Sequence, residues 1–166
     1  MSGDGRAIAN FILDRCDEQG RRISHLALQK LVFFCHVWSL VQKGQPLVRH
    51  QFEAWEYGPV LPYLYRDFRE FERDPITTRA RSLNPNTGTR DVVEGKFDDE
   101  TKKMLTKVVN FYSRLSATDL VKISHVKGGP WDQIWNHSGK VNPGMRIPNE
   151  LIAEFYVSAK PPFTLQ

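Results

Sequence analysis

Residues 24–42 read SHLALQKLVFFCHVWSLVQ, and this stretch decides the fold. Most of its positions are apolar, and Ser24 is a residue type that caps a helix by accepting a hydrogen bond from a free backbone N–H. Gly44 and Pro46 follow, and both residue types commonly stand where a helix stops. Because little polar surface remains around this helix, the pattern predicts that other elements surround it. We therefore expect a mainly α protein built around one central apolar helix.

Amphipathic patterns on both sides of the central helix predict further helices. Apolar residues recur there at helical spacing, and capping residues or prolines stand at several of the boundaries. The predicted ranges are 6–19, 60–73, 98–115, 116–124, 131–136 and 148–156.

Two segments are predicted not to be helical. Residues 52–57 have an extended, aromatic character and end at Gly58-Pro59, which we interpret as a rigid turn because proline fixes its own φ and disfavours helix for its predecessor. Residues 74–96 form a long loop with few hydrophobic residues, which can hold a small hairpin turning at residues 86–88. The expected fold is thus a compact helical domain with a short extended segment and a small β-hairpin.

Size and composition indicate one folded unit. A chain of 166 residues, 40% hydrophobic and 25% charged, can bury a real core. We expect a single domain over residues 1–160 and a tail over 161–166. No leader and no apolar run long enough to span a membrane are apparent, so a cytoplasmic protein without a membrane partner is expected. Cys16 and Cys35 suggest neither a disulfide framework nor a zinc site.

The histidines do not form a recognisable catalytic or metal-binding pattern. His25 and His36 share a predicted helix, but eleven residues at helical rise separate them by about 16 Å, too far to share a metal ion. His50, His125 and His137 lack a partner at metal-ligand spacing. A structural or surface role is favoured over catalysis for each of them, and no metal or cofactor is expected.

Other patterns typical of enzymes and nucleic-acid binders are weak. No phosphate-binding loop, dinucleotide motif or nucleophile elbow occurs. Glu53 and Glu56 should point to opposite faces of an extended segment. The 23 basic residues exceed the 19 acidic ones only modestly, so a nucleic-acid partner is not favoured. The basic residues of most interest fit a solvated surface better than a nucleic-acid groove; they are Arg21, Arg22, Arg79, Arg81 and Arg90.

A dense group of aromatic residues is more informative. Its members lie within 20 positions around the Gly58-Pro59 turn and are Phe52, Trp55, Tyr57, Tyr63, Tyr65, Phe68 and Phe71. Core packing should take most of these rings. Aromatic side chains with polar tips also anchor protein interfaces, so one or two of them are candidates for contacting a partner.

Several segments together resemble the Panacea domain of SocA-like antitoxins, known also from phage-associated GepA-type proteins. The matching segments, in the order in which the family has them across residues 5–157, are LQKLVFFCH at 28–36, FEAWEYGPV at 52–60 with Leu64-Tyr65, SATDL at 116–120, His125 with Pro130-Trp131, and Ile147 with 150–152 and 155–156. The stretch around Trp55 to Val60 is the most specific. Ser113 and Pro148 depart from the family pattern, which often has glycine and a capping serine at these positions.

The resemblance implies a mainly helical antitoxin, encoded in a bacterial or prophage operon, that neutralises a cognate toxin and is not an enzyme. We expect direct protein–protein binding, with the contact residues Lys30, Trp55, Tyr57, Gly58, Pro59 and Tyr65. Lys30 should lie either on a narrow solvent-facing strip of the central helix or against a buried carboxylate.

Three other functions stay open at this point. The first is an adaptor that delivers the toxin to the ClpXP protease, which the resemblance also implies. The second is an autoregulator that binds nucleic acid through Arg21, Arg22, Arg79 and Arg81. The third is an enzyme that acts through His125 or through Glu53 and Glu56.

Overall fold

The computed structural model describes residues 3–136 and 145–159, which form a mainly helical fold with two small sheets. The elements in this part of the chain are α1 (Gly5–Glu18), α2 (His25–Lys43), β1 (Phe52–Trp55), β2 (Gly58–Val60), α3 (Pro62–Phe68), the 3-10 helix η1 (Arg69–Phe71), β3 (Arg81–Leu83), β4 (Arg90–Val92), α4 (Asp99–Tyr112), α5 (Ala117–Ser124), α6 (Pro130–Trp135), β5 (Arg146–Ile147) and α7 (Asn149–Ser158). The mainly α class predicted from the sequence is confirmed.

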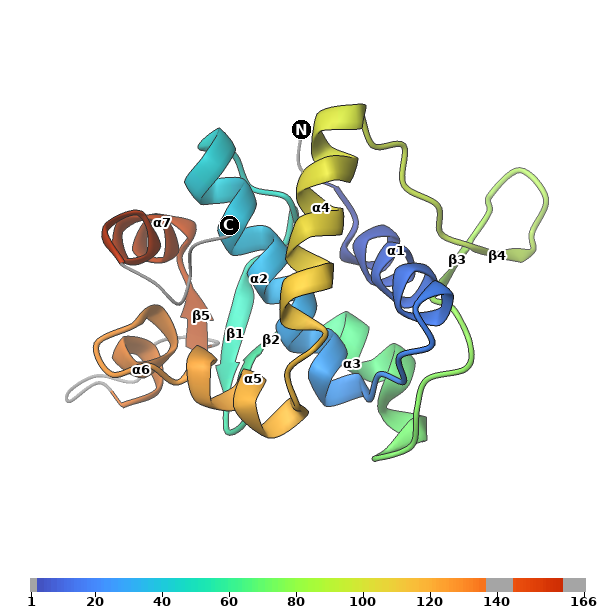
Figure 1. Cartoon of the computed structure of the whole chain (residues 1–166). Helices are drawn as coiled ribbons and strands as arrows, with labels where there is room; N and C mark the ends of the chain where they lie inside the picture. Colours follow the sequence, from blue (N-terminus) through green and yellow to red (C-terminus); the bar gives the residue numbers. More distant parts are fainter. Residues whose placement is uncertain (1–2, 137–144, 160–166) are drawn as a thin grey trace.

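Helix α2 is the centre of the fold, as its composition predicts. Its cap forms as expected, because Ser24 Oγ accepts a hydrogen bond from the Ala27 N–H at 3.3 Å, and it ends at Gly44 in a left-handed conformation with φ +66°. It packs against α1, α3, α4, α5, α7 and β2. Figure 1 shows it running through the middle of the molecule, with α1 on one side and the larger sheet on the other. This surrounding explains why every residue of α2 from Ala27 to Leu40 is buried.

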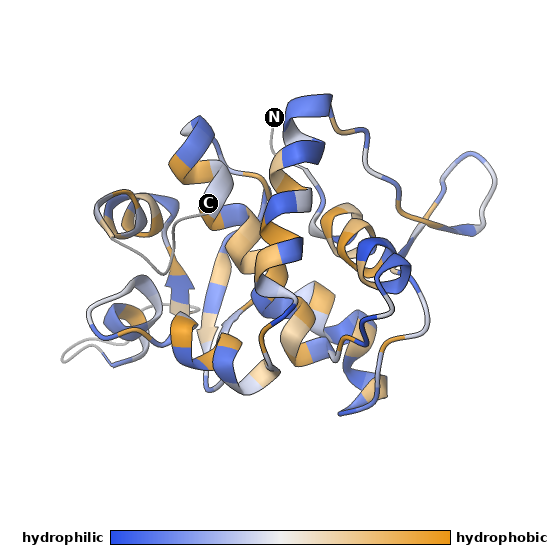
Figure 2. Ribbon diagram, viewed as in Figure 1, coloured by the Kyte–Doolittle hydropathy of each residue, from blue (hydrophilic) through white to orange (hydrophobic). Residues whose placement is uncertain are grey.

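Helix α4 covers one face of α2 and shows how the amphipathic helices complete the core. Asp98 caps it by accepting from the Thr101 N–H at 2.7 Å. Tyr112 stacks on Phe34 with 4.6 Å between ring centroids, and its hydroxyl accepts from Trp38 Nε1 at 3.0 Å. The bands of hydrophilic and hydrophobic residues that alternate along α4 in Figure 2 are those of a helix with one buried face.

The larger sheet has the strand order β2-β1-β5 and corrects one prediction. Gly58-Pro59 is not a turn. It forms strand β2, which pairs antiparallel with β1 so that Trp55 lies opposite Gly58 and Ala54 opposite Pro59, and the turn is Glu56-Tyr57. Proline is accepted in β2 because this is an edge strand, where a missing N–H donor costs little. Strand β5, which pairs with β1 from the other side, was not predicted.

Strands β3 and β4 form the hairpin expected within residues 74–96. The Gly88 N–H donates to Asn84 O at 2.8 Å, so the chain reverses where predicted. The base of the hairpin is fixed to α1 by Asn10, whose side chain bonds Ala80 O, Ala80 N and Val93 O at 2.8 to 3.0 Å. Figure 1 shows the hairpin as an arm that extends away from the helices.

Two helices are shorter than predicted, and the two residues that depart from the family pattern lie at helix ends. The helix expected over residues 60–73 is shorter, because α3 ends at Phe68 and continues only as η1. The helix expected to reach residue 115 ends at Tyr112, and Ser113 follows with φ −70°, a conformation that does not require glycine. Pro148 is the N-cap of α7 and provides no side-chain cap.

In the described ranges, no helix combines the length and the apolar character needed to cross a bilayer.

Candidate partner-binding site

Three of the predicted contact residues, Trp55, Tyr57 and Tyr65, line one open groove of about 700 Å³. We call it the aromatic groove. The turn of the β1–β2 hairpin, the start of α2, α3, the end of η1 and the start of α5 form its walls. The full lining is Ser24, His25, Leu26, Gln29, Trp55, Glu56, Tyr57, Val60, Tyr65, Glu72, Arg73, Ala117 and Thr118.

The aromatic side chains of the groove are held to different degrees. Trp55 and Tyr65 are half-buried and contact each other at 5.0 Å between ring centroids, and His25 lies against Tyr65 at 5.3 Å. Trp55 Nε1 also donates to Glu53 Oε1 at 3.1 Å. Tyr57, at the tip of the hairpin, is 59% exposed. The groove therefore combines a fixed aromatic wall with one large ring that is open to solvent.

Lys30 lies beneath the hairpin, and neither location expected for it is correct. Its side chain has no exposed surface, and its Nζ donates to the carbonyl oxygen of Pro59 at 3.0 Å. Among the described residues no carboxylate forms an ion pair with it. Removal from water disfavours the charged amine, so burial lowers the pKa of Lys30 to about 7.

Gly58 fits directly over Lys30. It has φ +112°, and a Cβ atom added to it would lie 2.5 Å from Lys30 Cε and 2.7 Å from Ser124 Oγ. Only a residue without a side chain can adopt this backbone conformation and approach so closely. Lys30 and Ser124 thus form the floor on which strand β2 lies.

A tryptophan from α6 holds the other strand of the hairpin. Trp131 Nε1 donates to the carbonyl oxygen of Trp55 at 2.7 Å, and the ring stacks on His125 with 3.6 Å between centroids. Gln29 bonds the backbone of Leu61, just after β2, through both atoms of its amide. The contact roles of Gln29, Ser124 and Trp131 were not recognised from the sequence. Gln29 and Trp131 lie in segments that match the family pattern, but Ser124 does not.

The two histidines near Lys30 are shifted toward their neutral form. Burial lowers the pKa of His25 and of His125, and the charge of Lys30 lowers both further. Neutral imidazoles reduce the concentration of positive charge beneath the hairpin. His137 lies outside the described residues.

The side chains considered for catalysis or metal binding are spread over several elements in the described part of the chain. In the described part of the chain, no cluster of three or more histidine, cysteine or acidic side chains could hold a metal ion. Glu53 is tied to Trp55, whereas Glu56 is exposed in the turn. Burial raises the pKa of Cys16 to about 11 and raises that of Cys35 as well, so both are protonated thiols at neutral pH.

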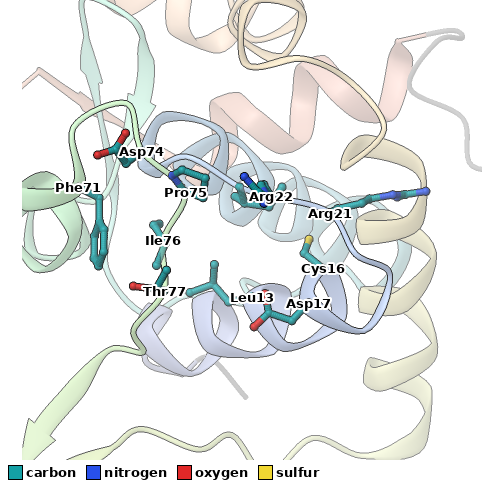
Figure 3. A pocket seen from close by; sticks show the side chains of 11 residues that line it. Leu13, Cys16, Asp17, Arg21, Arg22, Phe71, Asp74, Pro75, Ile76 and Thr77 are labelled. Atoms are coloured by element: carbon teal, nitrogen blue, oxygen red, sulfur yellow. The ribbon is translucent and has the colours of Figure 1, made fainter.

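The arginines considered for nucleic-acid binding are partly engaged within the fold. Arg79 pairs with Asp14 at 2.8 Å and with Asp17. Arg21 donates a hydrogen bond to Ser113 Oγ, just after the end of α4. In Figure 3 its side chain points away from Phe71 and Asp74. Arg21 and Arg22 border the pocket that Figure 3 shows, which has a volume of about 590 Å³ and is also lined by the acidic Asp17 and Asp74.

The fold and the groove define a small, mainly helical protein with an open aromatic groove on its surface. Comparison with known proteins identifies its family. Residues 28–132 match the model of the antitoxin SocA-like Panacea domain. The chain is also 40% identical over 155 residues to Antitoxin SocA of Caulobacter vibrioides (strain NA1000 / CB15N), an alignment that covers 93% of this chain and 82% of that relative. The protein therefore belongs to the SocA-like antitoxin family. No solved structure matches it.

Proposed function

We propose that this protein is an antitoxin that neutralises its cognate toxin by direct binding, and that the aromatic groove is the contact surface. Membership of the SocA-like family supports the antitoxin role. The observation that carries the site is the exposure of Tyr57 beside the fixed rings of Trp55 and Tyr65. Aromatic side chains at the centre of a binding surface contribute much of the affinity of protein complexes.

Direct binding explains the groove better than catalysis does. Its lining combines aromatic and aliphatic side chains with polar ones, Ser24, His25, Gln29 and Thr118, and with three exposed charged side chains, Glu56, Glu72 and Arg73. Protein interfaces typically combine apolar and aromatic contacts with polar groups in this way. The groove is also open to solvent, so a partner can reach its aromatic side chains.

The central experiment measures stability and toxin binding on the same variants. Tyr57→Ala should weaken the complex by roughly 30-fold, as expected for a contact worth about 2 kcal/mol, and leave the melting temperature unchanged. Leu83→Ala is the matched control, since Leu83 is 61% exposed but lies on the β3–β4 arm. If both variants bind toxin as the wild type does, the groove is not the contact surface.

Neutralisation in cells separates blocking from delivery to a protease. An antitoxin that blocks by binding protects cells that lack ClpXP as well as cells that contain it. Loss of protection only in the cells without the protease would favour the adaptor. Neutralisation at sub-stoichiometric amounts of antitoxin would instead indicate turnover and therefore an enzyme.

A further inference from the structure

Lys30 is the least expected buried side chain of the fold. It lies in the apolar first half of α2, and its amine donates a hydrogen bond to the backbone carbonyl of Pro59, 29 residues along the chain. A buried ammonium loses its hydration, and an apolar side chain of the same length would fill the same space without that penalty. The position of the Nζ atom, rather than the packing of the side chain, therefore needs an explanation.

The atom that Lys30 binds belongs to the hairpin that carries the exposed aromatic ring. Pro59 lies in β2 opposite Ala54 of β1, and the next pair toward the turn is Trp55 with Gly58. The Glu56-Tyr57 turn follows directly. If Pro59 moves, the neighbouring Trp55–Gly58 pair moves with it, and so does Tyr57 in the turn.

Lys30 and Ser124, which lie under β2, limit how closely the β1–β2 hairpin packs against the core. Gly58 lies against Lys30 Cε and Ser124 Oγ so closely that no β-carbon fits between them. Lys30 thus contacts β2 in two ways: its methylene chain supports Gly58 from below, and its Nζ holds Pro59 by a hydrogen bond.

We propose that Lys30 is a positioning residue for partner recognition, which acts from inside the fold by holding the β1–β2 hairpin where Trp55 and Tyr57 form the edge of the aromatic groove. This inference rests on the proposed function. It differs from a direct contact role, because Lys30 is fully buried and reaches the partner only through the hairpin.

The test compares Lys30→Met with Lys43→Met. Methionine extends as far as the Cε position of lysine and lacks the amine that donates the hydrogen bond. Lys43 is also on α2 and donates to Thr101 Oγ1 at 2.7 Å, at the end of the helix far from the hairpin. Both variants should fold. Lys30→Met should weaken toxin binding roughly tenfold, the effect of one well-made hydrogen bond, whereas Lys43→Met should not change it.

A double-mutant cycle shows whether Lys30 acts through the exposed ring. If Lys30 positions Tyr57, the loss of affinity caused by Tyr57→Ala should be smaller in the Lys30→Met background than in the wild type. The indole N–H resonance of Trp55 should shift in Lys30→Met but not in Lys43→Met. Lys30→Gln, which keeps an N–H donor one bond shorter, should restore part of the affinity, and it replaces Lys30→Met in the comparison if the methionine variant does not fold.

The outcomes separate this inference from the proposed function. If Tyr57→Ala weakens binding while Lys30→Met binds normally, the positioning role is wrong and the groove remains the contact surface. Strictly additive effects of the two substitutions would also overturn it. If neither Tyr57→Ala nor Lys30→Met changes binding, both the groove and the positioning role are wrong.

Discussion

Gly58 lies over the end of the Lys30 side chain so closely that an added Cβ atom would be 2.5 Å from Lys30 Cε. This contact joins the central helix to the only hairpin that borders the aromatic groove among the described residues. It couples a residue of the core to the surface through which we propose that the protein binds its toxin.

Gly58→Ala should lower the free energy of unfolding by about 2 to 4 kcal/mol. The φ of +112° is strained for any residue with a β-carbon, and the new methyl group would also collide with Lys30 and Ser124. Gly88→Ala is the control, because Gly88 has φ +73° and nothing within 4 Å of an added Cβ, so it isolates the backbone strain at about 1 kcal/mol. Chemical denaturation measures both. Equal losses for the two variants would mean that the contact with Lys30 contributes nothing.

The stability of the wild type should rise between pH 7 and pH 10 relative to that of Lys30→Met. Burial lowers the pKa of Lys30 from 10.5 to about 7, so between these values the unfolded chain binds a proton that the folded chain does not. Folding is then favoured as pH increases, by at most about 1.4 kcal/mol per pH unit. Urea denaturation at several pH values measures the difference. A difference that stays constant over this range would show that Lys30 remains charged in the folded protein.

His36 should make the fold sensitive to mild acid. Its Nδ1 accepts hydrogen bonds from the Leu47 and Val48 N–H groups at 3.3 and 3.1 Å, and its Nε2 donates to Asn149 Oδ1 at 2.9 Å. This arrangement requires the neutral ring, and burial lowers its pKa below 6.5.

Below pH 6.5 the unfolded chain therefore takes up a proton at His36 that the folded chain resists, so stability should fall as pH decreases from 7 to 5. The decrease should be smaller in His36→Gln, which does not titrate. Thermal melts of the wild type and His36→Gln across this range measure the difference, and identical profiles for the two proteins would contradict the prediction.

Trp131→Phe should weaken both the fold and toxin binding. Phenylalanine lacks the indole N–H that donates to Trp55 O at 2.7 Å. The half-buried carbonyl of Trp55 loses this hydrogen bond, which should lower the free energy of unfolding by about 1 to 2 kcal/mol. Trp38→Phe is the matched control, since it removes a buried hydrogen bond from the indole of Trp38 to Tyr112 of α4, on the side of α2 opposite to the hairpin. Both variants should melt at lower temperature, but only Trp131→Phe should lower toxin affinity at a temperature where both are folded. Equal affinities would show that this bond supports only the fold.

Much of the helical architecture follows from local patterns in the sequence. The apolar composition of residues 24–42 predicts a surrounded helix, and the caps Ser24, Asp98 and Ser116 accept the backbone hydrogen bonds expected of them. The β3–β4 hairpin could also be predicted, because its turn depends on residues next to one another. Helix caps and tight turns are local interactions, which the tertiary environment rarely overrides.

The strand at Gly58-Pro59 shows where local reasoning fails. Proline after glycine usually indicates a turn, and here both residues form an edge strand whose pairing with β1 moves the turn to Glu56-Tyr57. The strand can form because Gly58, which has no β-carbon, fits closely against Lys30 of α2. That contact is with a different element and cannot be predicted from neighbouring residues.

The sequence by itself thus determined the fold class, the central helix and the resemblance to SocA-like antitoxins. Tertiary structure alone decided the location of Lys30 and which aromatic rings are exposed. On a helix that is apolar almost all round, periodicity assigns no face to a lysine, and the carbonyl it binds is 29 residues away. The exposure of Tyr57 and the burial of Phe52, five residues earlier in the same aromatic run, likewise depend on which neighbours the folded chain brings to each ring.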